Sequence, residues 1–362
     1  MPRVALHLRG VFLPDETERD AWILDGRLTF TRPAGNADTI AAGGWVTPGF
    51  VDAHCHVGLA PQGHVPEPAL QAKQALLDRA AGALLLRDAG SPVDNTSIQD
   101  RNDLPRLIRA GRHIARTKRY IRGLGVEVEP DDLVAEVERQ VVQGDGSWVK
   151  IAADWIDREV GDLAPAFPDD ALRDGIARAH ELGARVAAHV FGEEALPGLI
   201  AAGIDSIEHG TGLTDDLIAR ASAAGSAVVP TLINIDNFPQ IAAGGAGKFP
   251  AYAAHMRSLY ATSRDRIRSA WEAGIPVYTG TDAGGSLPHG LVRDEIRALV
   301  GAGIPQPDVI AQASWRAREW LGLPGLDEGA PADLVVYETD PRTDLAAIMG
   351  PIRMVLRGNV VA

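Results

Sequence analysis

The sequence has little of three things: cysteine, excess basic charge and long apolar runs. Cys55 is the one cysteine among 362 residues, which excludes a disulfide within the chain and favours a reducing compartment. Lysine and arginine total 35 against 48 aspartates and glutamates, and the resulting net charge of −13 argues against a nucleic-acid partner. No stretch reaches about 18 apolar residues without a charge, and the N-terminus lacks the apolar block of a signal peptide. We therefore expect a soluble cytoplasmic protein with no membrane partner.

Apolar residues are plentiful, at 46% of the chain, and short β-like segments occupy both of its ends. Near the N-terminus, Asp25 and Gly26 separate two such segments and form a dipeptide that favours a tight hairpin. Neither end is long enough to bury a sheet of its own, so we expect the two ends to pair. The sequence predicts a small discontinuous β-sandwich domain of residues 1–47 and 328–362, and a second domain of residues 48–327.

Between the two ends, apolar strand-like segments alternate with amphipathic helical stretches, several of which end in glycine. Eight β-then-α units in about 280 residues are typical of an α/β protein with a closed (β/α)8 TIM barrel. A doubly wound open sheet is the alternative, but no glycine-rich phosphate loop follows the first strand. The predicted strands cover residues 50–56, 83–88, 113–121, 148–153, 185–190, 205–209, 227–232 and 276–281.

Active sites of such barrels lie at the carboxyl ends of the strands, so ionisable residues at these ends are candidates for chemistry. Imidazole and carboxylate groups are common ligands of divalent metal ions, and four of the ten histidines of the chain lie at these positions. The strand-end residues together predict a metal site. They are Asp52, His54, His56, Lys150, His189, His209 and Asp282.

His54 and His56 are the strongest single signal. Alternate residues of a strand share a face, which lets both imidazoles converge on one ion at about 2.1 Å. Cys55 then points to the opposite side and is expected in the core. Two histidines hydrogen-bonded within a core are the alternative, which would bury two polar rings that need partners.

Lys150, one of only four lysines, interrupts an otherwise apolar strand. Burial lowers the pKa of an amine, and a neutral amine can react with carbon dioxide to give a carbamate that bridges two metal ions. A lysine that extends out of the barrel, or that pairs with Asp154, is the alternative.

His189, His209 and Asp282 each end an apolar run. Taken singly, either histidine is compatible with a capping or core role, and the aspartate with a helix cap. In a metal site, Asp282 would accept a proton from a bound water.

The sequence as a whole resembles the amidohydrolase superfamily, specifically the branch of imidazolonepropionase and the Xaa-Pro dipeptidase-like enzymes. That family has a (β/α)8 barrel and a β-sandwich built from both termini. The matching segments read, in chain order, WVTPGFVDAHCH, LLLRDAG, WVKIAADW, ARVAAHV, GIDSIEHGTGL, VVPTL, AGIPVYTGTDAG, LPHG and EGAPADLVVYETDP.

The resemblance implies two divalent ions, usually Zn²⁺, with a hydroxide between them as the nucleophile. One ion would be held by His54, His56 and Asp282, and the other by His189 and His209. Carboxylated Lys150 would bridge the two ions. Asp282 would also be the catalytic residue that takes the hydroxide proton and returns it to the leaving amine.

The sequence departs from this branch after the third predicted strand, where residues 116–122 replace a Gly-Gly-His loop. Arg119 and Arg122 in this basic segment are candidates to face a substrate carboxylate, with Tyr120 hydrogen-bonding it as a substrate-binding residue. A solvated basic loop is the alternative. Trp155 and His289 are further candidates for the pocket, each with a packing or loop-capping role as the alternative.

We therefore expect a binuclear metal hydrolase that cleaves an amide bond in a small molecule, such as an N-acyl amino acid or a dipeptide. A mononuclear relative that opens a cyclic amide or deaminates a ring is one alternative, which would lack the lysine carbamate. An esterase, lactonase or phosphotriesterase with the same site is another. A non-enzymatic scaffold is disfavoured because all the ligand types are present, and a homo-oligomer is compatible with the sequence.

Overall fold

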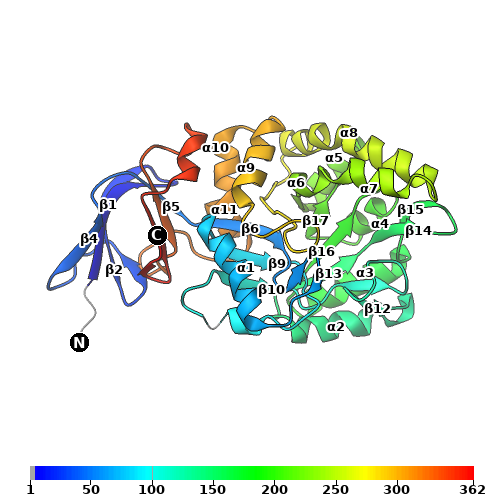
Figure 1. The fold of residues 1–362 in the computed structure, drawn as a ribbon, viewed down its shortest axis with the longest axis horizontal. Helices are drawn as coiled ribbons and strands as arrows, with labels where there is room; N and C mark the ends of the chain where they lie inside the picture. The colour runs from blue at the N-terminus through cyan, green and yellow to red at the C-terminus, as the bar shows by residue number, and fades with distance from the viewer. Residues whose placement is uncertain (1–4, 100) are drawn as a thin grey trace.

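The computed structural model describes residues 5–99 and 101–362, so residues 1–4 of the predicted terminal domain lie outside it. Figure 1 shows a β-sheet built from both ends of the chain beside a larger body in which helices surround parallel strands. This arrangement confirms the expected TIM-barrel-like α/β fold. Within the described ranges, no helix is both long and apolar enough to cross a membrane.

The terminal sheet contains eight strands in the order β21-β20-β19-β5-β1-β2-β3, with β4 beside β1. Antiparallel pairing of β5 with β19 joins the two ends of the chain. At the predicted hairpin between β2 and β3, Asp25 and Gly26 have φ values of 50° and 80°, as a type I′ turn requires. The strands are β1 (Ala5–Phe12), β2 (Thr17–Leu24), β3 (Arg27–Thr29), β4 (Ala37–Ala41), β5 (Trp45–Pro48), β19 (Leu334–Tyr337), β20 (Arg353–Leu356) and β21 (Asn359–Val360).

The larger body is built on two parallel sheets, one ordered β10-β9-β6 and the other β12-β11-β13-β16-β17-β18. Residues 276–281 join them, because Val277 bridges to Val228 of β18 and the Ala53 N–H of β6 donates to the Thr279 carbonyl at 2.8 Å. The strands are β6 (Phe50–Cys55), β9 (Ala83–Asp88), β10 (Arg106–Arg109), β11 (Ile114–Arg116), β12 (Val126–Val128), β13 (Trp148–Ala152), β16 (Arg185–Val190), β17 (Ser206–His209) and β18 (Ala227–Val229).

Three predicted strands differ from the structure in extent. The segment predicted over 113–121 is a strand only at β11, and a turn with Lys118 at φ 61° follows it. The prediction also missed β10, whose four residues RLIR are half charged and give no alternating pattern. The strand predicted over 227–232 ends at Val229, because Pro230 has no N–H to continue the ladder. Residues 276–281 make one isolated bridge, from Val277 to Val228, instead of a regular strand.

Helices surround the strands, and the helical stretches predicted at 133–142, 171–183 and 194–203 correspond to α2, α3 and α4. In α3, Leu172, Ile176 and Ala179 are spaced by three and four residues and face the core. The helices are α1 (Pro68–Ala80), α2 (Leu133–Gln143), α3 (Asp169–Glu181), α4 (Leu196–Ala201), α5 (Asp215–Ala224), α6 (Leu232–Ile235), α7 (Phe238–Gly245), α8 (Pro250–Glu272), α9 (Val292–Gly301), α10 (Gln306–Ala313) and α11 (Trp315–Trp320).

Two small hairpins extend the chain just beyond the carboxyl ends of parallel strands. Strands β7 (Leu59–Ala60) and β8 (Gly63–His64) follow β6, while β14 (Asp154–Asp157) and β15 (Asp162–Pro165) follow β13. These hairpins are additions to the alternating strands and helices, and they stand where the active site of such a fold is expected.

Candidate metal centre

The strand ends bring all six predicted ligands into one buried cluster. His54 of β6 and His56 just after it face each other, with their Nε2 atoms 3.3 Å apart. The Oδ1 atom of Asp282 lies 3.2 Å from His54 Nε2 and 2.9 Å from His56 Nε2. These three side chains form one half of the cluster.

His189 and His209 form the other half. His189 ends β16 and His209 ends the neighbouring strand β17, and the distance from His189 Nδ1 to His209 Nε2 is 2.9 Å. Lys150 reaches the cluster from β13, with Nζ 3.4 Å from His54 Nε2. One donor atom each of His54, His209 and Asp282 lies within 4.8 Å of the other two, so the two halves are continuous.

The outward-facing ring nitrogens are held by partners that the sequence interpretation did not identify. His54 Nδ1 is 2.6 Å from Glu208 Oε2, and His56 Nδ1 is 2.7 Å from the Gly90 carbonyl. An acceptor beside Nδ1 favours the tautomer that carries the ring proton on Nδ1. The Nε2 lone pair is then directed into the cluster, as in many metal-binding histidines. His209 Nδ1 is likewise 2.7 Å from the Thr231 hydroxyl.

Glu208 and Arg87 form a buried ion pair beneath the histidines. The Arg87 guanidinium donates to Glu208 Oε1 at 2.7 Å and lies 4.4 Å from the Trp148 ring centroid. Burial opposes ionisation of Glu208, but Arg87 and His54 outweigh it and hold the pKa of Glu208 well below its usual value. This pair was not predicted from the sequence; the signal that could have identified it is Arg87 in the mostly apolar β9 (ALLLRD) and Glu208 before the terminal histidine of β17 (SIEH).

The backbone at two of the predicted ligands is unusual. His209 and Asp282 have φ values of 70° and 57°, in the left-handed region that non-glycine residues rarely adopt. Such conformations cost about 1–3 kcal/mol and occur preferentially at functional sites. The Asn234 amide donates to Asp282 Oδ2 at 2.6 Å and fixes the orientation of the carboxylate. Burial opposes ionisation of Asp282, but the neighbouring His54, together with contacts to His56 and His209, outweighs it and holds the pKa of the carboxylate well below its usual range.

Lys150 is almost completely buried, and that burial lowers its pKa to about 8, although Glu208 and Asp282 favour the charged form. The neutral amine is therefore accessible near neutral pH. The alternative pairing of Lys150 with Asp154 is not formed, because that carboxylate accepts the backbone N–H groups of Phe191 and Gly192. Cys55 is fully buried on the other face of β6, with Sγ 3.8 Å from the Arg87 carbonyl, as expected for a core residue.

The donor set fits divalent metal ions. Four imidazoles, a carboxylate and an amine of lowered pKa converge in a space where protein acceptors occupy the far sides of three rings. On the fourth ring, His189 Nε2 has no hydrogen-bond partner, and the nearest carboxylate oxygen, Asp154 Oδ1, is 3.7 Å away. Nitrogen and oxygen donors in this combination are those that zinc prefers.

A cavity of about 550 Å³ opens onto this cluster and reaches His56, His189 and Asp282. Tyr120, the predicted substrate-binding residue, lines it, and so do Trp155 and Arg122. Burial raises the pKa of the Tyr120 hydroxyl, which therefore stays protonated and able to donate a hydrogen bond.

Two of the residues predicted to face the pocket do not line the cavity. Arg119 donates instead to Asp157 at 2.6 Å and to the Ala164 carbonyl at 3.0 Å, so it fastens the turn to the β14–β15 hairpin. His289 is buried and pairs with Asp78 of α1 at 2.8 Å, which anchors the segment that follows Asp282. In each case the side chain contacts an acid that is far away in the sequence, Asp157 for Arg119 and Asp78 for His289, so the contact could not be predicted from neighbouring residues.

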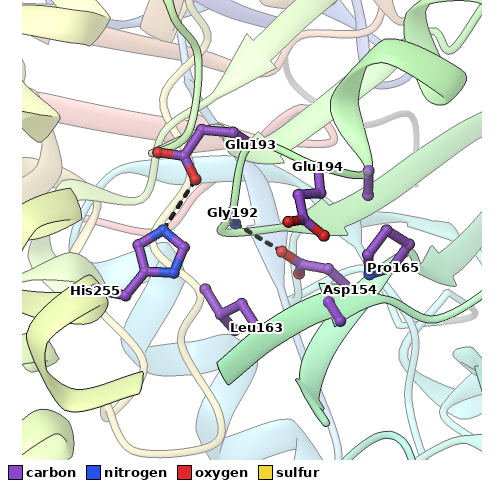
Figure 2. A pocket seen from close by; sticks show the side chains of 9 residues that line it. Asp154, Leu163, Pro165, Gly192, Glu193, Glu194 and His255 are labelled. Carbon is purple, nitrogen blue, oxygen red and sulfur yellow. Dashed lines mark hydrogen bonds and ion pairs between the residues drawn. The ribbon is translucent and has the colours of Figure 1, made fainter. Parts of the chain in front are cut away.

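A second, much smaller hollow of about 10 Å³ lies behind the end of β16, with room for about one water. Figure 2 shows Asp154 accepting the Gly192 N–H and His255 of α8 contacting Glu193. The other ring nitrogen of His255 is 3.0 Å from Asp162 of β15. This cluster holds in place the backbone beside Phe191, which is one of the residues that line the large cavity.

A TIM-barrel-like fold with histidines and an aspartate clustered at the carboxyl ends of its strands defines a class of barrel hydrolases. The model of the amidohydrolase family matches residues 45–361, and the chain belongs to that family, as the sequence motifs predicted. It is a hydrolytic enzyme that acts on carbon–nitrogen bonds.

The chain also has a relative that matches it along most of its length, and solved structures that share its fold. An uncharacterised protein of Mycobacterium tuberculosis is 55% identical over 357 residues, which cover 98% of this chain and 95% of the relative. A Xaa-Pro dipeptidase crystallised with methionine in its active site shares the fold, with a TM-score of 0.79, 21% identity and coverage of 98% and 99% of the two chains. Ochratoxinase of Aspergillus niger has a TM-score of 0.79 at 17% identity, covering 99% and 95%.

Proposed function

We propose that this enzyme is a binuclear metal-dependent amidohydrolase that cleaves an amide bond in an N-acyl amino acid or a dipeptide-like substrate. The observation that carries the proposal is the arrangement of two histidine pairs and Asp282 around the buried Lys150 amine. A dipeptide-like substrate agrees with the Xaa-Pro dipeptidase among the structures of similar fold.

In this proposal His54, His56 and Asp282 would hold one ion, His189 and His209 would hold a second, and carboxylated Lys150 would supply a ligand to both. Zinc is the proposed metal. When bound, two such ions would polarise the scissile carbonyl and lower the pKa of the attacking water.

Carboxylation of Lys150 requires the neutral amine, whose presence the lowered pKa supports. The amine nitrogen attacks the carbon of carbon dioxide, a nitrogen–carbon bond forms, and one amine proton leaves to solvent. The product is an anionic carbamate in a site that otherwise offers mostly neutral imidazoles. Burial and His209 hold the pKa of His189 well below its usual value, which supports neutral rings at neutral pH.

Asp282 is the proposed proton carrier. Its low pKa keeps the carboxylate ionised, and the hydrogen bond from Asn234 to Oδ2 holds it in one orientation. The carboxylate takes a proton from the attacking water as the carbon–oxygen bond forms. It returns that proton to the amine nitrogen as the carbon–nitrogen bond breaks, so the amine leaves in a neutral form.

Two residues of the cavity wall are proposed to bind the substrate. The Tyr120 hydroxyl would donate a hydrogen bond, and the exposed Arg122 guanidinium would meet a carboxylate at the cavity mouth. For the scaffold, we propose that the parallel strands and residues 276–281 form one closed (β/α)8 barrel. We also propose that residues 1–47 and 328–362 form the discontinuous β-sandwich domain.

Elemental analysis of protein expressed with zinc and bicarbonate tests the metal site. We expect about two ions per chain, hydrolysis of N-acyl amino acids or dipeptides, and loss of both in Lys150→Ala. Lys118→Ala is the matched control, because Lys118 is exposed on the turn after β11. About one ion per chain, unchanged in Lys150→Ala, would contradict the lysine bridge.

A further inference from the structure

The cavity has an aromatic wall, which we define as Tyr120, Trp155, Phe191 and Tyr252. The first three come from the turn after β11, from β14 and from the segment after β16, and Tyr252 belongs to α8. The rings of Tyr120, Trp155 and Phe191 form a connected surface: the Tyr120 and Trp155 centroids are 4.7 Å apart with the planes at 61°, and the Trp155 and Phe191 centroids are 6.5 Å apart. Four separate segments thus supply the aromatic residues of the cavity.

The aromatic wall is continuous with the candidate metal centre. His189 lies with its ring centroid 5.3 Å from Tyr120, 5.4 Å from Trp155 and 4.3 Å from Phe191. A group packed against the wall therefore lies directly beside the position that the scissile bond must occupy. The wall is placed to select the substituent nearest the amide.

The rest of the cavity lining carries few charges. Among the described residues that line the cavity, Asp282 is the one acid, and Arg122 is the one lysine or arginine. An anionic substituent placed against the wall would lose its hydration without gaining a partner, which is unfavourable. The remaining side chains near the mouth are mainly apolar, and they include Leu59, Ile121, Leu124 and Ile241.

We propose that the substrate amide carries an aromatic substituent next to the scissile bond, and that the aromatic wall binds it. This inference rests on the proposed amide hydrolysis and names its substrate class. Aromatic rings pack on one another with edge-to-face or offset geometry, so a wall of this composition favours an aromatic group over an aliphatic group of similar size. The volume of about 550 Å³ accommodates a ring together with the amide and a carboxylate.

Steady-state kinetics with matched amides test the proposal. N-acetylphenylalanine, N-acetylleucine and N-acetylglycine vary the amine side, and N-benzoylglycine places a ring on the acyl side. We expect kcat/KM for one of the two aromatic amides to exceed that for N-acetylglycine by about 10- to 100-fold, with N-acetylleucine intermediate. Equal rates for all four substrates would overturn the aromatic preference while leaving amide hydrolysis intact. If none of the four were hydrolysed, the proposed hydrolysis of N-acyl amino acids would be contradicted.

Trp155→Leu should reduce the ratio of kcat/KM for the aromatic amide to that for N-acetylglycine, mainly by raising KM for the aromatic amide. Tyr252→Leu, at the outer part of the wall, provides a second variant if the first fails to fold. Trp22→Leu is the matched control, because Trp22 is a half-buried tryptophan of β2 in the terminal sheet.

A binding measurement tests the aromatic wall independently of turnover. Calorimetry should show tighter binding of 3-phenylpropanoate than of propanoate to the zinc-loaded enzyme, and Trp155→Leu should remove the difference. Equal binding of the two carboxylates to the unaltered protein would overturn the inference, whether or not any amide is hydrolysed.

Discussion

The candidate metal centre and the aromatic wall share one cavity, but they come from different parts of the fold. The proposed ligands His54, His189 and His209 lie at the ends of parallel strands and are buried, and most of their rings have a second residue holding the far nitrogen. The aromatic wall comes from a turn, a hairpin, the segment after β16 and a helix. Under the proposed function, residues at the strand ends carry out the chemistry and residues on the connecting segments select the substrate. This division is common in barrel enzymes.

This comparison separates two kinds of substitution. A change at the metal centre should reduce turnover of every substrate, because it alters the reacting groups. A change at the aromatic wall, or in the contacts that support it, should alter relative rates or local stability and leave the chemistry intact. The predictions below test the division, from the largest expected effect to the smallest.

Asp282→Asn should have the largest effect. The amide cannot accept a proton from water, so kcat should fall by about 10²- to 10⁴-fold with every amide substrate. Kinetics on the zinc-loaded variant, with circular dichroism to verify folding, provide the measurement. Asp294→Asn is the control, because Asp294 is exposed on α9 and does not line the cavity. A kcat within tenfold of the unaltered enzyme would remove Asp282 from the proton pathway.

Glu208→Ala should mainly affect stability and metal affinity. It leaves the buried Arg87 guanidinium without its carboxylate, and breaking such a pair costs about 3–5 kcal/mol of unfolding free energy. It also frees His54 Nδ1, which should weaken metal binding by about 10- to 100-fold. Urea unfolding and competition with a zinc chelator measure the two effects.

Glu138→Ala is the control for Glu208, because it removes an exposed partner of Arg178 and should cost no more than about 1 kcal/mol. If the two glutamate variants lost the same stability, the Arg87–Glu208 pair would have no special role.

Arg87 and Glu208 also show what the sequence could and could not predict. Strand ends in a barrel meet at one rim, so the order of the strands was enough to predict that His54, His189 and Asp282 come together. The partner of a buried charge is not encoded locally: Arg87 and Glu208 are 121 residues apart, and only the fold brings β9 and β17 close enough for them to make contact. The motifs predicted which residues gather in the cluster, whereas the residues that support them required the structure.

The cavity wall was harder to predict for a related reason. The β14–β15 hairpin has the charged sequence of a loop, and β11 ends at Arg116, earlier than the apolar pattern indicated. Tyr120 and Arg119 are neighbours in sequence but point to different surroundings, one to the cavity and the other to Asp157. Side-chain direction in a turn depends on its backbone dihedrals, and residue spacing alone does not define them.

The smallest expected effect concerns His255, whose contacts hold segments of the aromatic wall in place. His255 of α8 contacts Glu193 at 2.9 Å (Figure 2). It also contacts Asp162 at 3.0 Å, and so ties the β14–β15 hairpin to the segment after β16. Burial opposes protonation of His255, but the hydrogen bonds with Asp162 and Glu193 outweigh it and raise the histidine pKa above its usual 6.5. The imidazolium is therefore favoured in the folded protein.

A folded-state pKa above the unfolded value gives stability that is complete below about pH 6.5 and is lost as the pH rises through the folded-state pKa. His255→Gln should therefore lower the unfolding free energy by about 0.2–1 kcal/mol at about pH 6 and by less at about pH 9, because the contacts are partly exposed. Asp154, whose pKa burial raises to about 7, also titrates in this range, but it is present in both proteins and largely cancels in their difference. Denaturant titrations at the two pH values give that difference, while kcat for N-acetylglycine should stay unchanged. If the loss of unfolding free energy in His255→Gln grew with pH, His255 would support the wall as a neutral ring. If kcat for N-acetylglycine fell, this contact would also affect the metal centre, and the two regions would not be independent.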